Sequence, residues 1–181
     1  MNVKQQYARG KKMQAKNLKL REKLWADVPD EELWLRLKQK GFTTIPRTMP
    51  IIVNIIDALT KNAAAGYTYF CLWCRSFDAQ VIDIPHPADL AAESGFSGER
   101  AVSTWRQRMK ALKEHGFIMC EEGTHDYQYV LLLNPHKVIQ RKEGEVPKKL
   151  FAQLLNRAFD VGARDMTEEE PASEATGGSK D

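Results

Sequence analysis

The sequence predicts a mainly α-helical fold with a small β-hairpin, and three observations support this. Apolar residues recur every three or four positions over residues 49–59 and 101–112, which is the spacing of helices with one buried face. Two short runs rich in β-branched and aromatic residues, 117–121 and 127–134, flank a polar loop and indicate a hairpin. The 181 residues are 43% hydrophobic and 28% charged, which is typical of one globular domain with tails.

Residues 17–40 are expected to form two helical pieces. The first carries three leucines on a basic background. Pro29, followed by three carboxylates, is typical of a helix start, because proline fits the first turn and acidic side chains there favour the helix dipole. The glycine at position 41 is expected to end the second piece.

The middle of the chain is expected to form two apolar helices and a short strand. Residues 44–46 open the first helix, and residues 62–66 close it. Residues 67–79 carry the second helix. The β-branched residues at 81–84 then predict a short strand that ends at a proline.

Three further helices are expected around the hairpin. One runs over residues 87–94, and a longer one runs from Ser97 or Gly98 to about His115. The last begins at Pro147 and ends near residue 159. Its apolar stripe is expected either to complete the core or to form a two-fold interface, and it consists of Leu150, Phe151, Leu154, Leu155, Ala158 and Phe159.

Two patterns in one window connect these elements to a known family. Leu90-Ala91 is followed after three residues by Gly95 and an apolar residue, so that a small side chain lets two helices cross and glycine permits a sharp turn. Leu112 is followed after three residues by Gly116 and two apolar residues. With these patterns, residues 86–134 resemble the winged helix-turn-helix DNA-binding family.

The resemblance implies a winged helix-turn-helix with extra N-terminal and C-terminal helices that binds specific sequences of double-stranded DNA without catalysis. We expect a transcriptional regulator, acting as a repressor, or an accessory factor in plasmid replication or partition. The N-terminal half of the second helix reads bases in this geometry. The expected base-contacting residues are Ser97, Arg100, Ser103, Thr104 and Gln107.

A second set of residues is expected to contact phosphates, which position the protein without specifying sequence. The set is Arg106, Arg108, Lys110, Thr124, His125, Lys11, Lys12 and Lys16. The hairpin itself contains no Lys or Arg and has acids at Glu121, Glu122 and Asp126. It is therefore expected either to stand off the DNA or to touch it only through its threonine and histidine.

The charge distribution supports a polyanionic partner. Residues 1–24 carry eight Lys or Arg residues against one Glu, a net charge of +7, whereas residues 160–181 carry seven acids against two bases. We therefore divide the chain into a basic, partly helical arm (1–24), a winged-helix domain with flanking helices (25–159) and an acidic, disordered tail (160–181).

Other classes of function lack support in the sequence. No run is long enough to cross a membrane, and no signal peptide is evident, so we expect a cytoplasmic, nucleoid-associated protein. Cys71 and Cys74 are expected to be buried core residues, because a zinc site would need two further ligands nearby. We expect no enzyme activity, no cofactor, no metal and no small-molecule ligand.

Two other classes of function are alternatives to specific binding of double-stranded DNA. The exposed surface could serve a protein–protein interaction adaptor with a winged-helix fold. Binding of single strands or RNA is a further alternative. We also expect a homodimer, formed through the C-terminal or the N-terminal helix, which would match a palindromic site.

Overall fold

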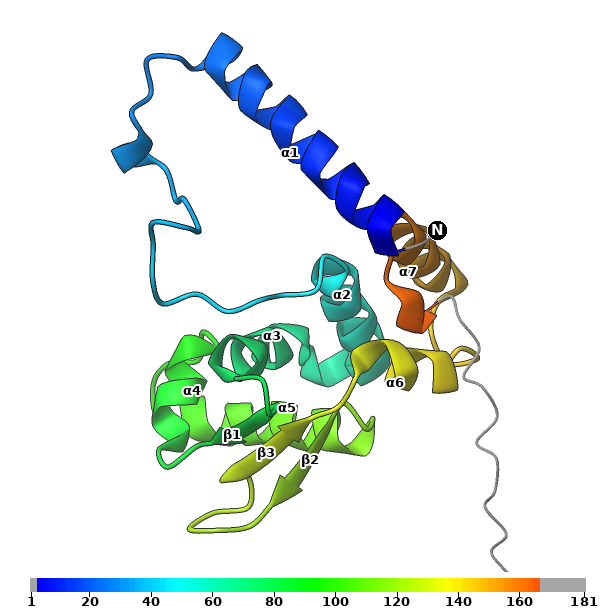
Figure 1. Ribbon diagram of the computed structural model, residues 1–181. Helices are drawn as coiled ribbons and strands as arrows, with labels where there is room; N and C mark the ends of the chain where they lie inside the picture. Colours follow the sequence, from blue (N-terminus) through cyan, green and yellow to red (C-terminus); the bar gives the residue numbers. More distant parts are fainter. Residues whose placement is uncertain (1–2, 167–181) are drawn as a thin grey trace, which may run out of the picture. The chain divides into compact units, whose positions relative to one another are not determined.

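The computed structural model describes residues 3–166 and divides the chain into two compact units, residues 1–44 and 45–181 (Figure 1). The compact second unit begins at residue 45, twenty residues later than the predicted boundary after residue 24. The predicted disordered tail begins too early at residue 160, because residues 160–166 form the end of a helix and a 3-10 turn in which Met166 is buried. The rest of the predicted tail, from position 167 onward, lies outside the described residues.

The first unit consists of helix α1 (Val3–Leu24) and the single 3-10 turn η1 (Asp30–Glu32). The prediction of a second helix reaching residue 40 is wrong. The backbone becomes extended at Leu33, and two large apolar side chains that follow stay exposed. Trp34 is 69% exposed and Leu37 is 96% exposed. A short helix without packing is only marginally stable, so the helix-start signal at residue 29 produces one turn.

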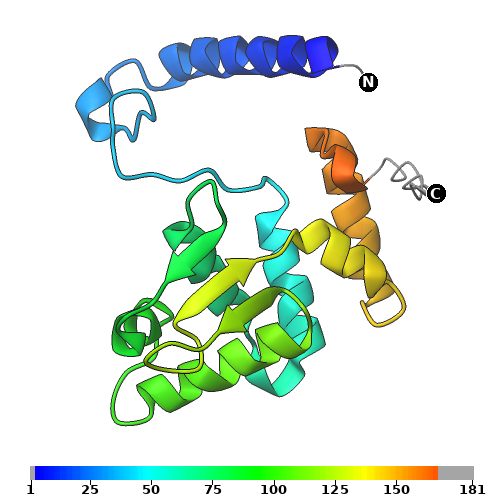
Figure 2. The ribbon, with the colours of Figure 1, turned by 60° about the horizontal axis from the view of Figure 1, so that its bottom comes forward.

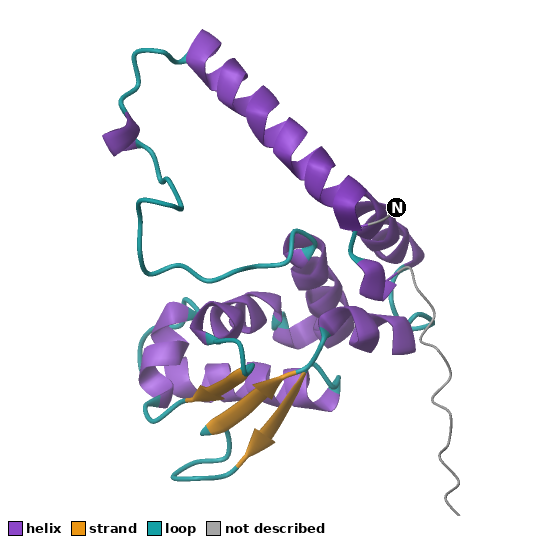
Figure 3. Cartoon of the chain, viewed as in Figure 1, coloured by secondary structure: helices purple, strands orange, loops and turns teal. Residues whose placement is uncertain are grey.

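The second unit is a helical assembly with one small sheet (Figure 3). Its elements are α2 (Met49–Thr60), η2 (Lys61–Ala63), α3 (Gly66–Arg75), β1 (Val81–Asp83), α4 (Pro87–Glu93), α5 (Ala101–Glu114), β2 (Ile118–Glu121), β3 (Tyr129–Leu132), α6 (Pro135–Arg141), α7 (Lys148–Val161) and η3 (Arg164–Met166). The prediction of a mainly α-helical fold with a small β-hairpin is confirmed.

Helix α6 was not predicted, although its start carries a recognisable signal. The Asn134 side chain accepts a hydrogen bond from the backbone N–H of His136, and Pro135 occupies the first turn. An asparagine cap followed by proline is typical of a helix start. The predicted strand includes residue 134, which is the cap of α6. The β-rich run ends immediately before this residue, so the sequence pattern gives no separation between strand and helix.

The three strands form an antiparallel sheet in the order β1-β3-β2. In the sheet register, Val130 of the central strand β3 lies between Ile82 of β1 and Cys120 of β2, and these three side chains are buried. This inner face of the sheet packs towards α5 (Figure 2). The other row of the register, Val81, Leu131 and Met119, is exposed.

Helix α2 lies at the centre of the core and contacts α3, α5 and α7. Gly66, at the start of α3, lies directly against α2, and its N–H donates to the Asp57 carboxylate at 2.7 Å. On α7, Leu154 and Ala158 are fully buried, so its apolar stripe completes the core, whereas Phe159 is 74% exposed.

Candidate nucleic-acid interface

The turn between α4 and α5 is built by local backbone requirements. Gly95 has a φ of +83°, a left-handed conformation that glycine adopts without the cost imposed by a Cβ. The backbone N–H groups of Gly95 and Phe96 donate to the carbonyls of Ala92 and Ala91, and these bonds close the end of α4. The turn that the resemblance requires is therefore present at the predicted glycine.

Helix α4 is tied to α3 by an ion pair between Arg75 and Glu93. Arg75 Nε and Nη2 donate to the two carboxylate oxygens of Glu93 at 2.8 and 2.5 Å. These hydrogen bonds hold the pKa of Glu93 below its usual value. Such a two-point contact fixes the orientation of α4 against α3 as well as the distance between them.

Helix α5 is amphipathic in the way the sequence predicts. Trp105, Met109 and Leu112 have no exposed surface, and together they fix which side of the helix faces solvent. Ala101 and Val102 are half-buried at the N-terminal end. The opposite side therefore presents its polar residues outward, because a helix packed on one face leaves the other exposed.

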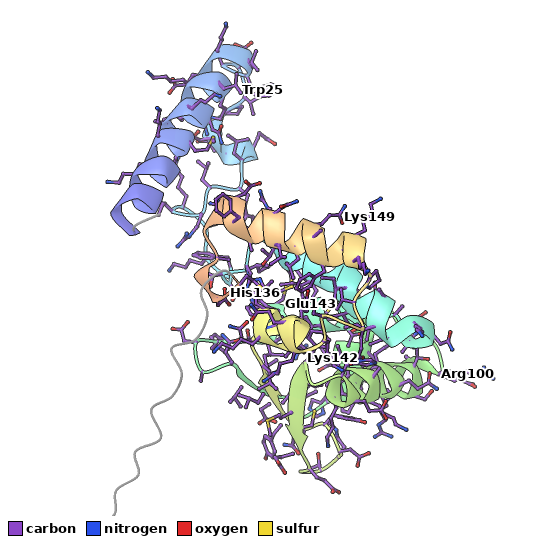
Figure 4. All side chains as sticks on the ribbon, turned by 90° about the vertical axis from the view of Figure 1, so that its right-hand side faces the viewer. Trp25, Arg100, His136, Lys142, Glu143 and Lys149 are labelled. Atoms are coloured by element: carbon purple, nitrogen blue, oxygen red, sulfur yellow. The ribbon has the colours of Figure 1, made fainter. Side chains whose placement is uncertain are left out.

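Four of the five predicted base-contacting residues are exposed. They are Ser97, Arg100, Ser103 and Gln107, whereas Thr104 is half-buried. Arg100 extends away from the ribbon at the start of α5 (Figure 4). The Ser103 hydroxyl donates to the Arg100 carbonyl at 2.9 Å, which leaves its lone pairs as acceptors.

The basic residues expected to contact phosphate differ in their environment. Arg106 and Lys110 are exposed, and Lys110 Nζ lies 3.8 Å from a Glu114 carboxylate oxygen. Arg108 is half-buried, and its guanidinium lies 5.5 Å from the ring centroid of Phe96. The Arg108 Nε is buried and has no hydrogen-bond partner within the described residues. This arginine therefore packs against the turn as well as carrying charge.

The loop between β2 and β3 uses His125 for structure. Its Nε2–H donates to the Ile84 carbonyl at 2.7 Å, and its Nδ1 accepts from the Tyr127 N–H at 3.3 Å. Both ring nitrogens are therefore engaged within the protein, so the predicted phosphate contact would require these bonds to break. Thr124 is exposed, as are the acids Glu122 and Asp126 around it.

Residues of η2 border the same helix, which the sequence reasoning did not anticipate. A depression of about 340 Å³ lies between η2 and the C-terminal half of α5, lined by Asn62, Lys110 and His115 among others. Lys61 of η2 has a φ of +41° and is exposed. Only the fold brings this segment, more than forty residues earlier in the sequence, to the edge of α5.

The predicted phosphate contacts in the first unit lie on α1. Lys11, Lys12 and Lys16 are all exposed there. The same helix exposes Met13 and three leucines, and none of residues 10–44 is buried. Basic and apolar side chains are therefore both exposed on this helix.

One constellation that sequence reasoning missed has the order of a hydrolytic triad. His136 Nε2 lies 2.8 Å from the Thr48 hydroxyl, and His136 Nδ1 lies 3.0 Å from both carboxylate oxygens of Asp165. Thr48 is only 1% exposed, however, and His136 only 5%. A nucleophile at Thr48 would be out of reach of a substrate, so the network serves to join α2, α6 and η3.

The cysteine prediction is partly wrong. Cys71 and Cys120 are buried, but Cys74 is exposed, because it lies on the outer side of α3. Burial raises the pKa of the Cys120 thiol to about 11 and also raises that of Cys71. Among residues 3–166, no three His, Cys, Asp or Glu side chains are arranged to hold a metal ion.

No family model, curated protein or solved structure matches this chain. Within the described residues, no helix combines the length and apolarity needed to span a membrane.

Proposed function

We propose that the second unit is a winged helix-turn-helix domain that binds specific sequences of double-stranded DNA through α5. Helices α4 and α5, the glycine turn between them and the hairpin β2–β3 follow one another in the order that the resemblance implies. The extra helices α1 and α7 lie on either side of this segment in the sequence.

The observation that carries the proposal is the contrast between the two sides of α5. Trp105, Met109 and Leu112 are fully buried, whereas Arg100 and Gln107 are exposed. Neither of the two exposed side chains makes a hydrogen bond or an ion pair with any residue in the range 3–166. They remain available to a partner, and the helix that carries them is anchored rigidly.

These two side chains have the chemistry for reading base edges. Arginine pairs with the two acceptors of guanine in the major groove, and glutamine pairs with adenine. Each such bidentate pair contributes about 1–3 kcal/mol of discrimination against the wrong base. Arg106 and Lys110 would add phosphate contacts that strengthen binding to all sequences alike.

The wider role that we propose is non-catalytic: a transcriptional repressor, or an accessory factor in plasmid replication or partition, associated with the nucleoid. A homodimer would suit a palindromic target. Because α7 uses its stripe in the core, we assign the dimer contact to the exposed apolar residues of α1, with Phe159 as a further exposed residue.

The test is selection of bound duplexes from a random pool at two salt concentrations. We expect an enriched motif, arranged as an inverted repeat if the protein is a dimer. Replacing Arg100 and Gln107 together by Ala should weaken binding to that motif at least about tenfold while non-specific binding persists.

A matched control variant replaces Gln153 and Arg157 by Ala, an exposed pair of the same residue types on α7. It should bind the selected motif as the unmodified protein does. Binding without enrichment, or equal loss in both double variants, would contradict the proposal.

A second candidate, a protein–protein interaction adaptor, is favoured by the outer face of the sheet. Val81, Leu131 and Met119 form an exposed apolar row across three strands, with Glu121 and Asp83 beside it. Under this alternative, the change of Met119 and Leu131 to Glu abolishes capture of a protein partner, and the Arg100 and Gln107 variant leaves it unchanged.

A further inference from the structure

A cavity of about 420 Å³ opens at the end of the sheet, next to α6 and η3. This volume lies in the range of small-molecule sites. Its apolar lining includes Trp73 and Leu133. Its polar lining consists of Gln80, Asn134, His136 and Asp165. None of these residues belongs to the proposed DNA-contacting face of α5.

The donor groups in this lining are already used within the protein. Asn134 Nδ2 donates to the Asp165 carboxylate at 2.9 Å, and its Oδ1 accepts from the His136 backbone N–H. His136 (Figure 4) contacts the same carboxylate through Nδ1 and the Thr48 hydroxyl through Nε2. The polar side chains therefore have few donors to offer a ligand.

Acceptor capacity remains in the lining. The Gln80 Oε1 is buried and has no hydrogen-bond partner within residues 3–166, although its amide Nε2 donates to the Phe77 carbonyl. The Asp165 carboxylate has three contacts from two side chains, two on Oδ2 and one on Oδ1, which leaves about one of its four lone-pair positions open, on Oδ1. Its side chain is 36% exposed, so this remaining capacity can be reached.

The backbone at Gln80 has a second unusual property. Its φ is +58°, in the left-handed region that residues with a Cβ seldom adopt. The conformation is held because the Gln80 carbonyl accepts from the Leu132 N–H at 2.9 Å, at the end of β3. Such conformations cluster at functional sites, where the surrounding structure maintains them.

We propose that this cavity binds a small organic ammonium or amidinium ion with an apolar body. Asp165 carries the opposite charge and accepts an N–H of the ligand. Trp73 and Leu133 contact its apolar part, and an aromatic ring next to a cation adds attraction. An anion is disfavoured because the polar lining has acceptors and a negative charge to present. This inference does not depend on the proposed DNA binding.

The test titrates the full-length protein with 2-phenylethylamine and benzamidine by calorimetry and by amide and indole NMR. We expect a Kd of about 1 mM or lower, as is usual for ligands of this size. The neutral 2-phenylethanol and the anion phenylacetate have similar shapes and should bind at least about tenfold more weakly. The indole signal that Trp73→Phe removes should shift on addition of the amines.

Two variants distinguish the contribution of the Asp165 charge from that of the cavity volume, and a third serves as a control. Asp165→Asn keeps the size of the side chain and should weaken amine binding at least about tenfold. Ala163→Leu fills part of the cavity and should abolish binding, whereas Ala152→Leu, an exposed position on α7, should not. Circular dichroism checks that each variant is folded. If Asp165→Asn unfolds the protein, the comparison of Ala163→Leu with Ala152→Leu still tests whether the amine binds in the cavity.

Three outcomes would overturn the inference. The first is no amine binding at about 10 mM. The second is equal binding of amine, alcohol and acid. The third is amine binding that survives Ala163→Leu. The DNA selection would be unaffected by any of them.

Discussion

Trp105 of α5 packs its indole edge-on against the ring of Tyr127 in the β2–β3 loop, with the ring centroids 6.0 Å apart and the planes at 86°. The His125 ring lies on the same indole, with a centroid distance of 6.4 Å. One side chain on the buried side of the proposed DNA-contacting helix therefore also contacts the hairpin loop.

We predict that Trp105→Ala lowers the free energy of unfolding by about 3–5 kcal/mol, because it leaves a large cavity under α5. Trp105→Phe should cost less than about 2 kcal/mol, since it keeps an aromatic ring and removes an indole N–H that has no partner within the described residues. Urea denaturation measures both. Equal losses in the two variants would contradict this account of the packing.

Gly66→Ala should destabilise the second unit by about 1–3 kcal/mol. A Cβ there would overlap the Val53 carbonyl oxygen and lie 2.9 Å from Asp57 Oδ1, where α2 and α3 approach closely. The control is Gly10→Ala on α1, which has no neighbour within 4 Å and should instead raise helix content. Thermal unfolding followed by circular dichroism checks both signs.

The contact between Asp165 and His136 should make stability depend on pH. Burial by itself would raise the pKa of Asp165, but hydrogen bonds from Asn134 and His136 outweigh it, so the pKa lies below its usual value. A lowered pKa means that the folded state favours the carboxylate. The stabilisation is therefore present above the unfolded pKa of about 3.9 and is lost as the pH falls through the folded value.

Asp165→Asn should accordingly cost about 1 kcal/mol at neutral pH, a small value because the side chain is partly exposed to solvent. The difference from the unmodified protein should shrink below about pH 4. Asp160→Asn, an exposed position on α7, should change stability by less than about 0.5 kcal/mol at either pH. A difference that grows towards low pH would show that the sign is wrong.

The proposed DNA binding predicts a dependence on salt that includes α1. Changing Lys11, Lys12 and Lys16 to Ala should reduce the slope of log K against log salt by about 0.9 for each phosphate contact that is lost. Preference among duplex sequences should stay the same, because phosphate contacts carry no sequence information. Filter binding at several salt concentrations provides the slope. An unchanged slope would exclude α1 from the DNA contact. As a control, changing Lys148 and Lys149 on α7 to Ala should leave the slope unchanged.

The features that the sequence alone determined are those that depend on nearby residues. The buried stripe of α5 follows from apolar side chains spaced by three and four, and the turn before it follows from Gly95. The hairpin followed from two β-rich runs around a polar loop, and the structure has both strands. For the same reason, the exposure of Arg100 and Gln107 could be inferred from their places on the helix.

Other features were decided only by tertiary structure. The helix-start signal at Pro29 yields one turn, because Trp34 and Leu37 stay exposed and a short helix without packing is only marginally stable. The sequence predicts that His125 is an exposed loop residue, but in the folded protein its ring donates a hydrogen bond to the Ile84 carbonyl. The cavity beside Asp165 depends on contacts between residues far apart in the chain: His136 lies 88 positions from Thr48 and 29 from Asp165. No local pattern encodes such contacts, because they form only when separate elements pack together.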